Sequence, residues 1–104
     1  MKSDIIDKRH IPIDKIAEFC RRWQITQMAL FGSVLREDFN QESDIDVLVS
    51  FAPNAPWGLF ELVDMQDELV RIFGRKVDLV EREALRNPFR RKHILQHLEV
   101  VYEA

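Results

Sequence analysis

Helix-like and strand-like segments alternate along this chain, and that alternation is what most restricts the folds open to it. Three stretches repeat apolar residues every three or four positions, as amphipathic helices do: residues 12–23, 57–73 and 87–102. Three short apolar runs have the character of buried strands: residues 25–31, 45–51 and 76–80. We therefore expect the α/β (α+β) class, with a small sheet of three strands or slightly more covered by helices.

The domain organisation follows from length and from the distribution of apolar anchors. At 104 residues the chain is too short for two ordinary domains, so residues 1–104 are expected to form a single one. Residues 1–10 are polar with few apolar anchors, and we expect a loose N-terminal arm. The segment that opens at Asn87-Pro88 is expected to remain helical through Tyr102.

Charge and cysteine content restrict the partners and the compartment. The formal charge is −3, which argues against direct nucleic-acid binding through bulk charge. A single cysteine, Cys20, allows no internal disulfide and suits the reducing cytoplasm. No apolar run approaches the ~20 residues of a membrane span, and the first four residues lack the apolar region of a signal peptide. We expect a cytoplasmic protein with no membrane contact.

A pair of carboxylates stands at the head of the strongest strand candidate, which runs from Ile45 to Phe51. Side chains two apart on a strand point to the same side, so Asp44 and Asp46 should project together. Two adjacent negative charges repel, and divalent cations between them would relieve the repulsion. Ligands that offer only oxygen favour Mg²⁺ or Mn²⁺ over zinc. Taken alone, however, an Asp-x-Asp pair at the start of a strand is more often a pair of ordinary polar turn residues than a metal site.

A glycine and a serine, Gly32-Ser33, end the preceding strand candidate. Glycine lets the backbone approach a ligand closely, and a helical turn expected over Ser33–Asp38 would present free N–H groups suited to phosphate. Alone, this pattern is more often an ordinary helix cap. Beside a carboxylate pair on the next strand, it supplies what metal-dependent phosphoryl chemistry requires.

A third carboxylate, Asp78, lies among apolar residues of the 76–80 strand. A buried unpaired aspartate is costly, so its place in a core strand calls for a partner. That partner is either a nearby lysine or arginine or, if this strand lies beside the second, the metals bound by Asp44 and Asp46.

With these residues in place, the chain resembles the minimal nucleotidyltransferases (MNT) of the DNA-polymerase-β-like superfamily. More narrowly, it resembles the antitoxins of HEPN–MNT toxin–antitoxin pairs. The family pattern is Gly-Ser, ten residues, Asp-x-Asp, and a later Asp on a strand, with an arginine often at the position of Arg36. The likeness covers nearly the whole chain and implies a polymerase-β-like fold with a mixed sheet.

The resemblance also implies a reaction: the transfer of AMP from ATP to a hydroxyl, with two Mg²⁺ ions and release of pyrophosphate. Asp44 and Asp46 would hold both metals, and Asp78 would complete the site of the metal that activates the acceptor. Gly32 and Ser33 would hold phosphates, with Arg36 as a further phosphate contact. The acceptor is expected to be a tyrosine of a cognate HEPN ribonuclease toxin, which AMPylation silences.

Two other functions remain open from the sequence. The first is a catalytically silent antitoxin of the same fold, which neutralises its toxin by binding alone. The second is a nucleic-acid-binding regulator that uses the basic cluster Arg86–His93, although this cluster could equally face an acidic partner or nucleotide phosphates.

Overall fold

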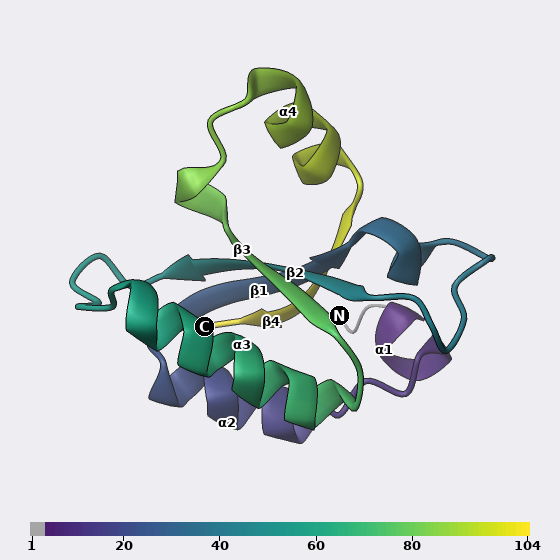
Figure 1. Cartoon of the computed structure of the whole chain (residues 1–104), viewed down its shortest axis with the longest axis horizontal. Coiled ribbons are helices and arrows are strands. Elements are labelled where there is room, and N and C mark those ends of the chain that lie inside the picture. Colours follow the sequence, from purple (N-terminus) through teal and green to yellow (C-terminus); the bar gives the residue numbers. More distant parts are fainter. Residues whose placement is uncertain (1–3) are drawn as a thin grey trace.

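A four-stranded mixed sheet forms the centre of the computed structural model, which describes residues 4–104 (Figure 1). The strands are β1 (Ile25–Phe31), β2 (Ile45–Phe51), β3 (Val77–Glu81) and β4 (Leu98–Glu103). Their order is β3-β2-β1-β4. β1 is antiparallel to β2 and β4, whereas β2 and β3 are parallel. The expected fold class is confirmed, with one strand more than the three we located.

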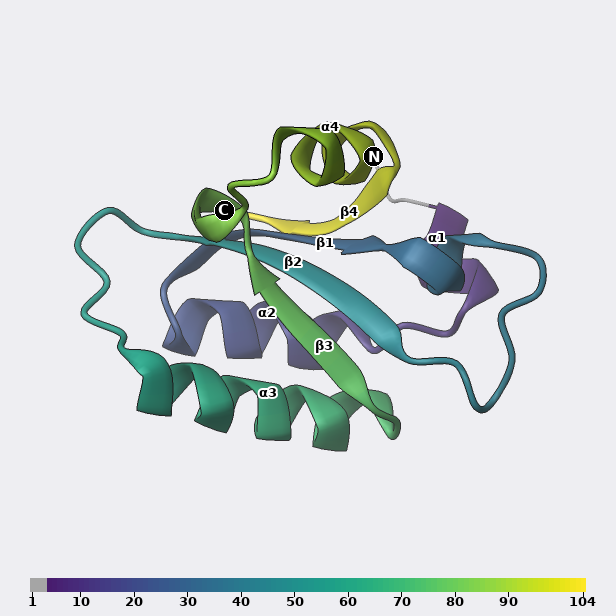
Figure 2. The ribbon, with the colours of Figure 1, turned by 45° about the horizontal axis from the view of Figure 1, so that its top comes forward.

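Helices cover both faces of this sheet. They are α1 (Asp4–Lys8), α2 (Ile13–Arg22), α3 (Leu59–Phe73) and α4 (Pro88–Gln96), together with the short 3₁₀ helices η1 (Gly32–Leu35) and η2 (Arg82–Ala84). Figure 2 shows α2 and α3 side by side on one face and α4 on the other. No helix within residues 4–104 is both long and apolar enough to cross a membrane.

The two central strands bury both of their sides. Met28 and Leu30 of β1 belong to the larger core beneath α2 and α3, whereas Ala29 and Phe31 belong to a smaller core on the α4 side. This follows from the alternation of side chains along a strand that is covered on both faces. The C-terminal end of β1 is therefore fixed by packing on two sides, and the candidate site lies where this end meets the start of β2.

The prediction of a loose N-terminal arm is wrong for the described part of residues 1–10. Asp4–Lys8 forms α1, and Ile5 and Ile6 are only 6% and 8% exposed in the main core. These two isoleucines are the apolar anchors that we judged insufficient. Residues 1–3 lie outside the described residues.

The prediction of a helix continuing through Tyr102 is also wrong. α4 ends at Gln96, and Leu98–Glu103 instead pairs with the free edge of β1 as β4. Leu98 and Val100 pack into the α4-side core, whereas Val101 is buried in the main core. Their side chains therefore fall on two faces of a strand, and pairing with β1 prevails over the three- and four-residue spacing that suggested a helix.

Candidate active site

A sharp turn at Gly32 carries the chain out of β1 and into η1. Gly32 has φ +76°, in the left-handed region that glycine adopts without strain. A Cβ atom at this position would collide with Oδ2 of Asp46 and lie 3.2 Å from its Cγ. The backbone of the turn thus lies directly against the Asp46 carboxylate, and any side chain at this position would force that carboxylate to move. The helical turn expected over Ser33–Asp38 is in fact a single 3₁₀ turn over Gly32–Leu35.

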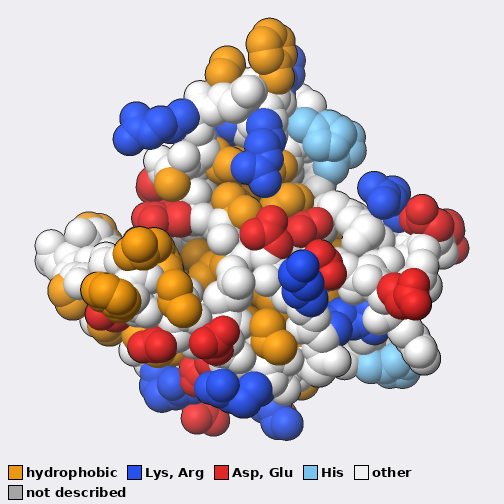
Figure 3. Space-filling view, viewed as in Figure 1, with side chains coloured by type: hydrophobic (Ala, Val, Ile, Leu, Met, Phe, Trp, Pro, Cys, Tyr) orange, Lys and Arg blue, Asp and Glu red, His pale blue; other side chains and the backbone are white. Residues whose placement is uncertain are grey.

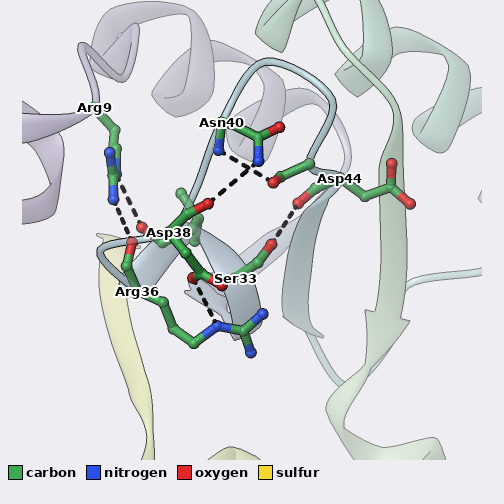
Figure 4. A network of polar contacts seen from close by, with 8 residues as sticks. Arg9, Ser33, Arg36, Asp38, Asn40 and Asp44 are labelled. Carbon is green, nitrogen blue, oxygen red and sulfur yellow. Dashed lines mark hydrogen bonds and ion pairs between the residues drawn. The ribbon is translucent and has the colours of Figure 1, made fainter.

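Ser33 joins this turn to the start of β2. Its hydroxyl donates a hydrogen bond to the carbonyl oxygen of Asp44, at 3.1 Å (Figure 4). A hydroxyl has one proton, so donating it to a phosphate would replace this bond. The contact holds the two halves of the Gly-Ser…Asp-x-Asp pattern side by side.

The three aspartates stand on neighbouring parts of the β2–β3 pair. Asp44 is exposed immediately before β2, and its carboxylate is turned away from Ser33 (Figure 4). Asp46 is half-buried within β2, and its register partner on the parallel strand β3 is Asp78. Adjacent register partners project to the same face of a sheet. Figure 3 shows acidic side chains gathered over β2 and β3, with basic side chains beside them.

Charge is concentrated at Asp46. The pKa of its carboxyl is raised, first by burial and then by the negative charges of Asp78 and Asp44, while Arg90 and Arg36 act in the opposite direction. The Asp46 carboxylate therefore lies close enough to Asp78 and to Asp44 to be repelled by both. A cation would relieve this repulsion, and a donor set made only of carboxylate oxygens suits Mg²⁺. No three metal-binding side chains in residues 4–104 are already grouped to hold an ion, so closing around one requires side-chain rotation.

Asp78 is exposed, which corrects the expectation of a buried residue in a core strand. β3 is an edge strand of the sheet, and the Asp78 side chain faces solvent. No ion pair to Asp78 is found in the part of the chain that the structure describes, so the lysine or arginine partner considered from the sequence is not observed. Its near neighbour in register is Asp46.

Arg36 lies just after η1, with its side chain largely exposed. Its Nε donates to Asp38 at 3.2 Å in a surface ion pair (Figure 4). It also lines a cavity of about 730 Å³ between the Gly32 turn and α4. In this arrangement the guanidinium is engaged with Asp38, so contact with a phosphate would require it to exchange that partner.

The opposite wall of this cavity holds residues that the sequence pattern did not assign to the site. Arg90, His93 and His97 line it from α4 and the turn after α4. The rings of the two histidines stack at 4.5 Å, and Nδ1 of His97 lies 2.8 Å from the carbonyl oxygen of His93. The basic cluster Arg86–His93 was the available signal, but only the fold shows that the charge of Arg90 acts on Asp46 and that Arg90 shares the cavity with Gly32.

Comparison with known proteins gives the family. Residues 13–101 match the family model described as a nucleotidyltransferase domain. The chain is 35% identical over 77 residues to a Methanocaldococcus jannaschii protein proposed to be a protein adenylyltransferase, MJ1379, covering 74% of this chain and 77% of the relative. It is 32% identical over 85 residues to the protein adenylyltransferase MntA of Thermococcus cleftensis, covering 82% of this chain and 81% of the relative.

Solved structures share the fold. A crystal structure of a toxin–antitoxin complex with AMP-PNP has a TM-score of 0.73 at 19% identity, covering 89% of this chain and 74% of that one. A complex of tri-AMPylated HEPN toxin with MNT antitoxin from Shewanella oneidensis has a TM-score of 0.67 at 17% identity, covering 92% and 73%. With the family match over most of its length, the chain belongs to the nucleotidyltransferase domain family and is a nucleotidyltransferase related to the protein adenylyltransferases.

Proposed function

We propose that this protein is an antitoxin that transfers AMP from ATP to a hydroxyl, expected to be a tyrosine, of a cognate HEPN ribonuclease toxin. The observation that carries the proposal is the register of Asp46 beside Asp78, with the Gly32 turn against Asp46. Support for the nucleotide and the acceptor comes from proteins with the same fold, one bound to AMP-PNP and another paired with an AMPylated toxin.

Asp44, Asp46 and Asp78 would hold two Mg²⁺ ions. Bound there, the ions would neutralise charge on the triphosphate and lower the pKa of the acceptor hydroxyl. The repulsion of the Asp46 carboxylate by Asp78 and Asp44 supports this assignment, because it leaves the cluster with excess negative charge beside the Gly32 turn. Arg90 and Arg36 supply fixed positive charge on the same side, which favours the anionic substrate.

The remaining residues of the site bind and orient ATP. Backbone N–H groups of the Gly32-Ser33 turn, with the Ser33 hydroxyl, would hold the β- and γ-phosphates. The acceptor oxygen then forms a bond to the α-phosphorus as the bond to the bridging oxygen breaks, and pyrophosphate leaves. We assign the acceptor's proton to Asp78, an exposed carboxylate beside Asp46.

A cytoplasmic location suits this activity, since both ATP and a ribonuclease target are found there. Cys20 is buried, and desolvation raises the pKa of its thiol to about 12, so it behaves as a small apolar residue and not as a nucleophile. We therefore assign no part of the reaction to Cys20.

The proposal is tested by incubating the purified protein with ATP labelled in the adenine ring, Mg²⁺ and the HEPN toxin encoded beside it. We expect the label on the toxin and loss of its ribonuclease activity. Formation of a complex that silences the toxin without label would instead establish neutralisation by binding alone. A control with ATP labelled in the γ-phosphate should leave the toxin unlabelled, because transfer releases that phosphate within pyrophosphate.

A further inference from the structure

Two arginines from distant parts of the chain bind the loop that links the Gly32 turn to the first of the three aspartates, Asp44. We call residues 33–44 the site loop, since it begins at Ser33 and ends at Asp44. Arg9 follows α1, and Arg75 lies between α3 and β3. Neither arginine belongs to the motif that identifies the family, and within residues 4–104 neither makes a hydrogen bond or an ion pair to the side chains of the three aspartates.

Arg9 binds the first half of the site loop. Its Nε donates to the carbonyl oxygen of Val34 at 3.0 Å, and its Nη2 donates to that of Arg36 at 2.7 Å (Figure 4). Val34 is fully buried and directly follows Ser33. Through these two hydrogen bonds Arg9 fixes the backbone immediately after the Gly32 turn.

Arg75 binds the second half. Its Nη1 donates to the carbonyl oxygens of Asn40 at 2.8 Å and of Ser43 at 3.1 Å. Ser43 directly precedes Asp44, and the next residue, Ile45, donates its N–H to the carbonyl oxygen of Lys76. The backbone on both sides of Asp44 is therefore tied to the segment around Arg75.

Phe39, near the middle of the site loop, connects the two arginines. The guanidinium carbon of Arg9 lies 4.7 Å from the centre of the Phe39 ring, and that of Arg75 lies 4.5 Å from it. Both distances are typical of cation–π contacts. Phe39 also packs against the main core, so the loop is anchored by one aromatic ring and four bonds to its carbonyl oxygens.

We propose that Arg9 and Arg75 are positioning residues that set the site loop, so that Ser33 and Asp44 serve one bound nucleotide. This rests on the proposed function of the site. Arg9 acts on the Ser33 side and should govern nucleotide affinity. Arg75 acts on the Asp44 side and should govern the Mg²⁺ concentration that transfer requires. Through Arg9, the segment that contains α1 then helps to position the site loop.

The two arginines should also differ in how they tolerate lysine. Arg75 uses one nitrogen for two carbonyl oxygens, which a lysine ammonium can imitate, so Arg75→Lys should recover part of the function lost in Arg75→Ala. Arg9 uses two nitrogens of a rigid fork, which lysine cannot reproduce. Arg9→Lys should therefore resemble Arg9→Ala.

The test uses the full chain and these four variants, with Arg22→Ala as the matched control. Arg22 also makes two hydrogen bonds, to Glu68 on α3. Within residues 4–104 no hydrogen bond or ion pair joins Arg22 to the site loop. Amide hydrogen exchange reports the order of residues 33–44, titration with AMP-PNP and Mg²⁺ reports nucleotide affinity, and the transfer assay reports the Mg²⁺ requirement. If the alanine variants fail to fold, the lysine variants still compare the two arginines, and Phe39→Leu weakens both halves of the site loop at once.

We expect faster exchange confined to the site loop, with nucleotide affinity falling about tenfold in Arg9→Ala and the Mg²⁺ requirement rising about tenfold in Arg75→Ala. Arg22→Ala should lower thermal stability and change neither quantity. Unchanged affinity and Mg²⁺ requirement in both variants would overturn the inference, even if the loop exchanges faster. A wild-type protein that binds no nucleotide would refute the proposed function, whereas faster exchange confined to the loop would still show that the arginines order it.

Discussion

Gly32→Ala adds a single methyl group where β1 turns toward the aspartates, and the structure separates its cost into two parts. The backbone stands at φ +76°, where a residue with a Cβ loses about 1 kcal/mol relative to glycine. The new Cβ would also collide with Oδ2 of Asp46, so the carboxylate must move, and moving a side chain off its preferred rotamer costs about 0.5–1.5 kcal/mol. We therefore expect the free energy of unfolding to fall by about 1.5–2.5 kcal/mol in total.

Gly74→Ala provides a matched control within the same chain. Gly74 has φ +71°, but nothing lies within 4 Å of the position of a Cβ there. This substitution should cost only the backbone part, about 1 kcal/mol. The difference between the two variants isolates the contact between the Gly32 turn and Asp46.

Urea denaturation followed by circular dichroism measures both free energies by linear extrapolation. A double variant, Gly32→Ala with Asp46→Ala, removes the carboxylate and should regain the part of the cost that comes from the collision, which a double-mutant cycle quantifies. If Gly32→Ala costs no more than Gly74→Ala, the close approach of the turn to Asp46 is not what requires glycine, and our account of the turn is wrong.

Three further predictions concern the titration of Asp46, the hydrogen bonds of Glu68 and the reactivity of the Cys20 thiol. The pKa of Asp46 is raised, so without divalent cations the folded state binds its proton more tightly, and the free energy of unfolding should fall as pH rises from 3.8 toward the raised value. Asp78→Asn should lower the pH at which the Asp46 carboxyl titrates by NMR. Glu68→Ala should cost about 1 kcal/mol in urea denaturation, because the part-buried Trp23 indole N–H loses its acceptor, whereas the exposed Arg22 guanidinium can turn to water. Cys20 should react with a thiol reagent at pH 8 only after unfolding.

Each of these three has a contrary outcome. An Asp46 titration that is unmoved by Asp78→Asn would mean that the two carboxylates do not interact. A Glu68→Ala variant as stable as wild type would mean that the Trp23 indole N–H does not need Glu68 as its acceptor. Rapid labelling of Cys20 in the native state would contradict its burial in α2.

The strands that carry the site were predictable from the sequence, because their apolar runs are short and sharply bounded. β1 ends at Phe31 before Gly32, and β2 ends at Phe51 before the proline-rich loop, as expected. The pairing of Asp46 with Asp78 was expected only on the condition that β3 lies beside β2. A parallel crossover through α3 meets that condition.

Other features depend on contacts that local patterns do not encode. Leu98–Glu103 has spacing compatible with a helix, and only the open edge of β1 selects a strand. The exposure of Asp78 follows from the edge position of β3, which apolar neighbours in sequence cannot reveal. In the same way, Arg9 and Arg75 are ordinary charged residues until the fold brings them to Phe39.

The central claim is that the aspartates beside the Gly32 turn perform AMP transfer, and it is tested most directly by comparing three proteins in one transfer assay. These are the wild type, Asp44→Asn, and Asp67→Asn, in which an exposed aspartate of α3 is changed instead. Intact-mass spectrometry of the HEPN toxin after incubation with Mg²⁺ and ATP counts the AMP groups added. We predict AMP on the toxin with the wild type and Asp67→Asn and none with Asp44→Asn, whose circular dichroism should be unchanged. Full transfer by Asp44→Asn would contradict the account.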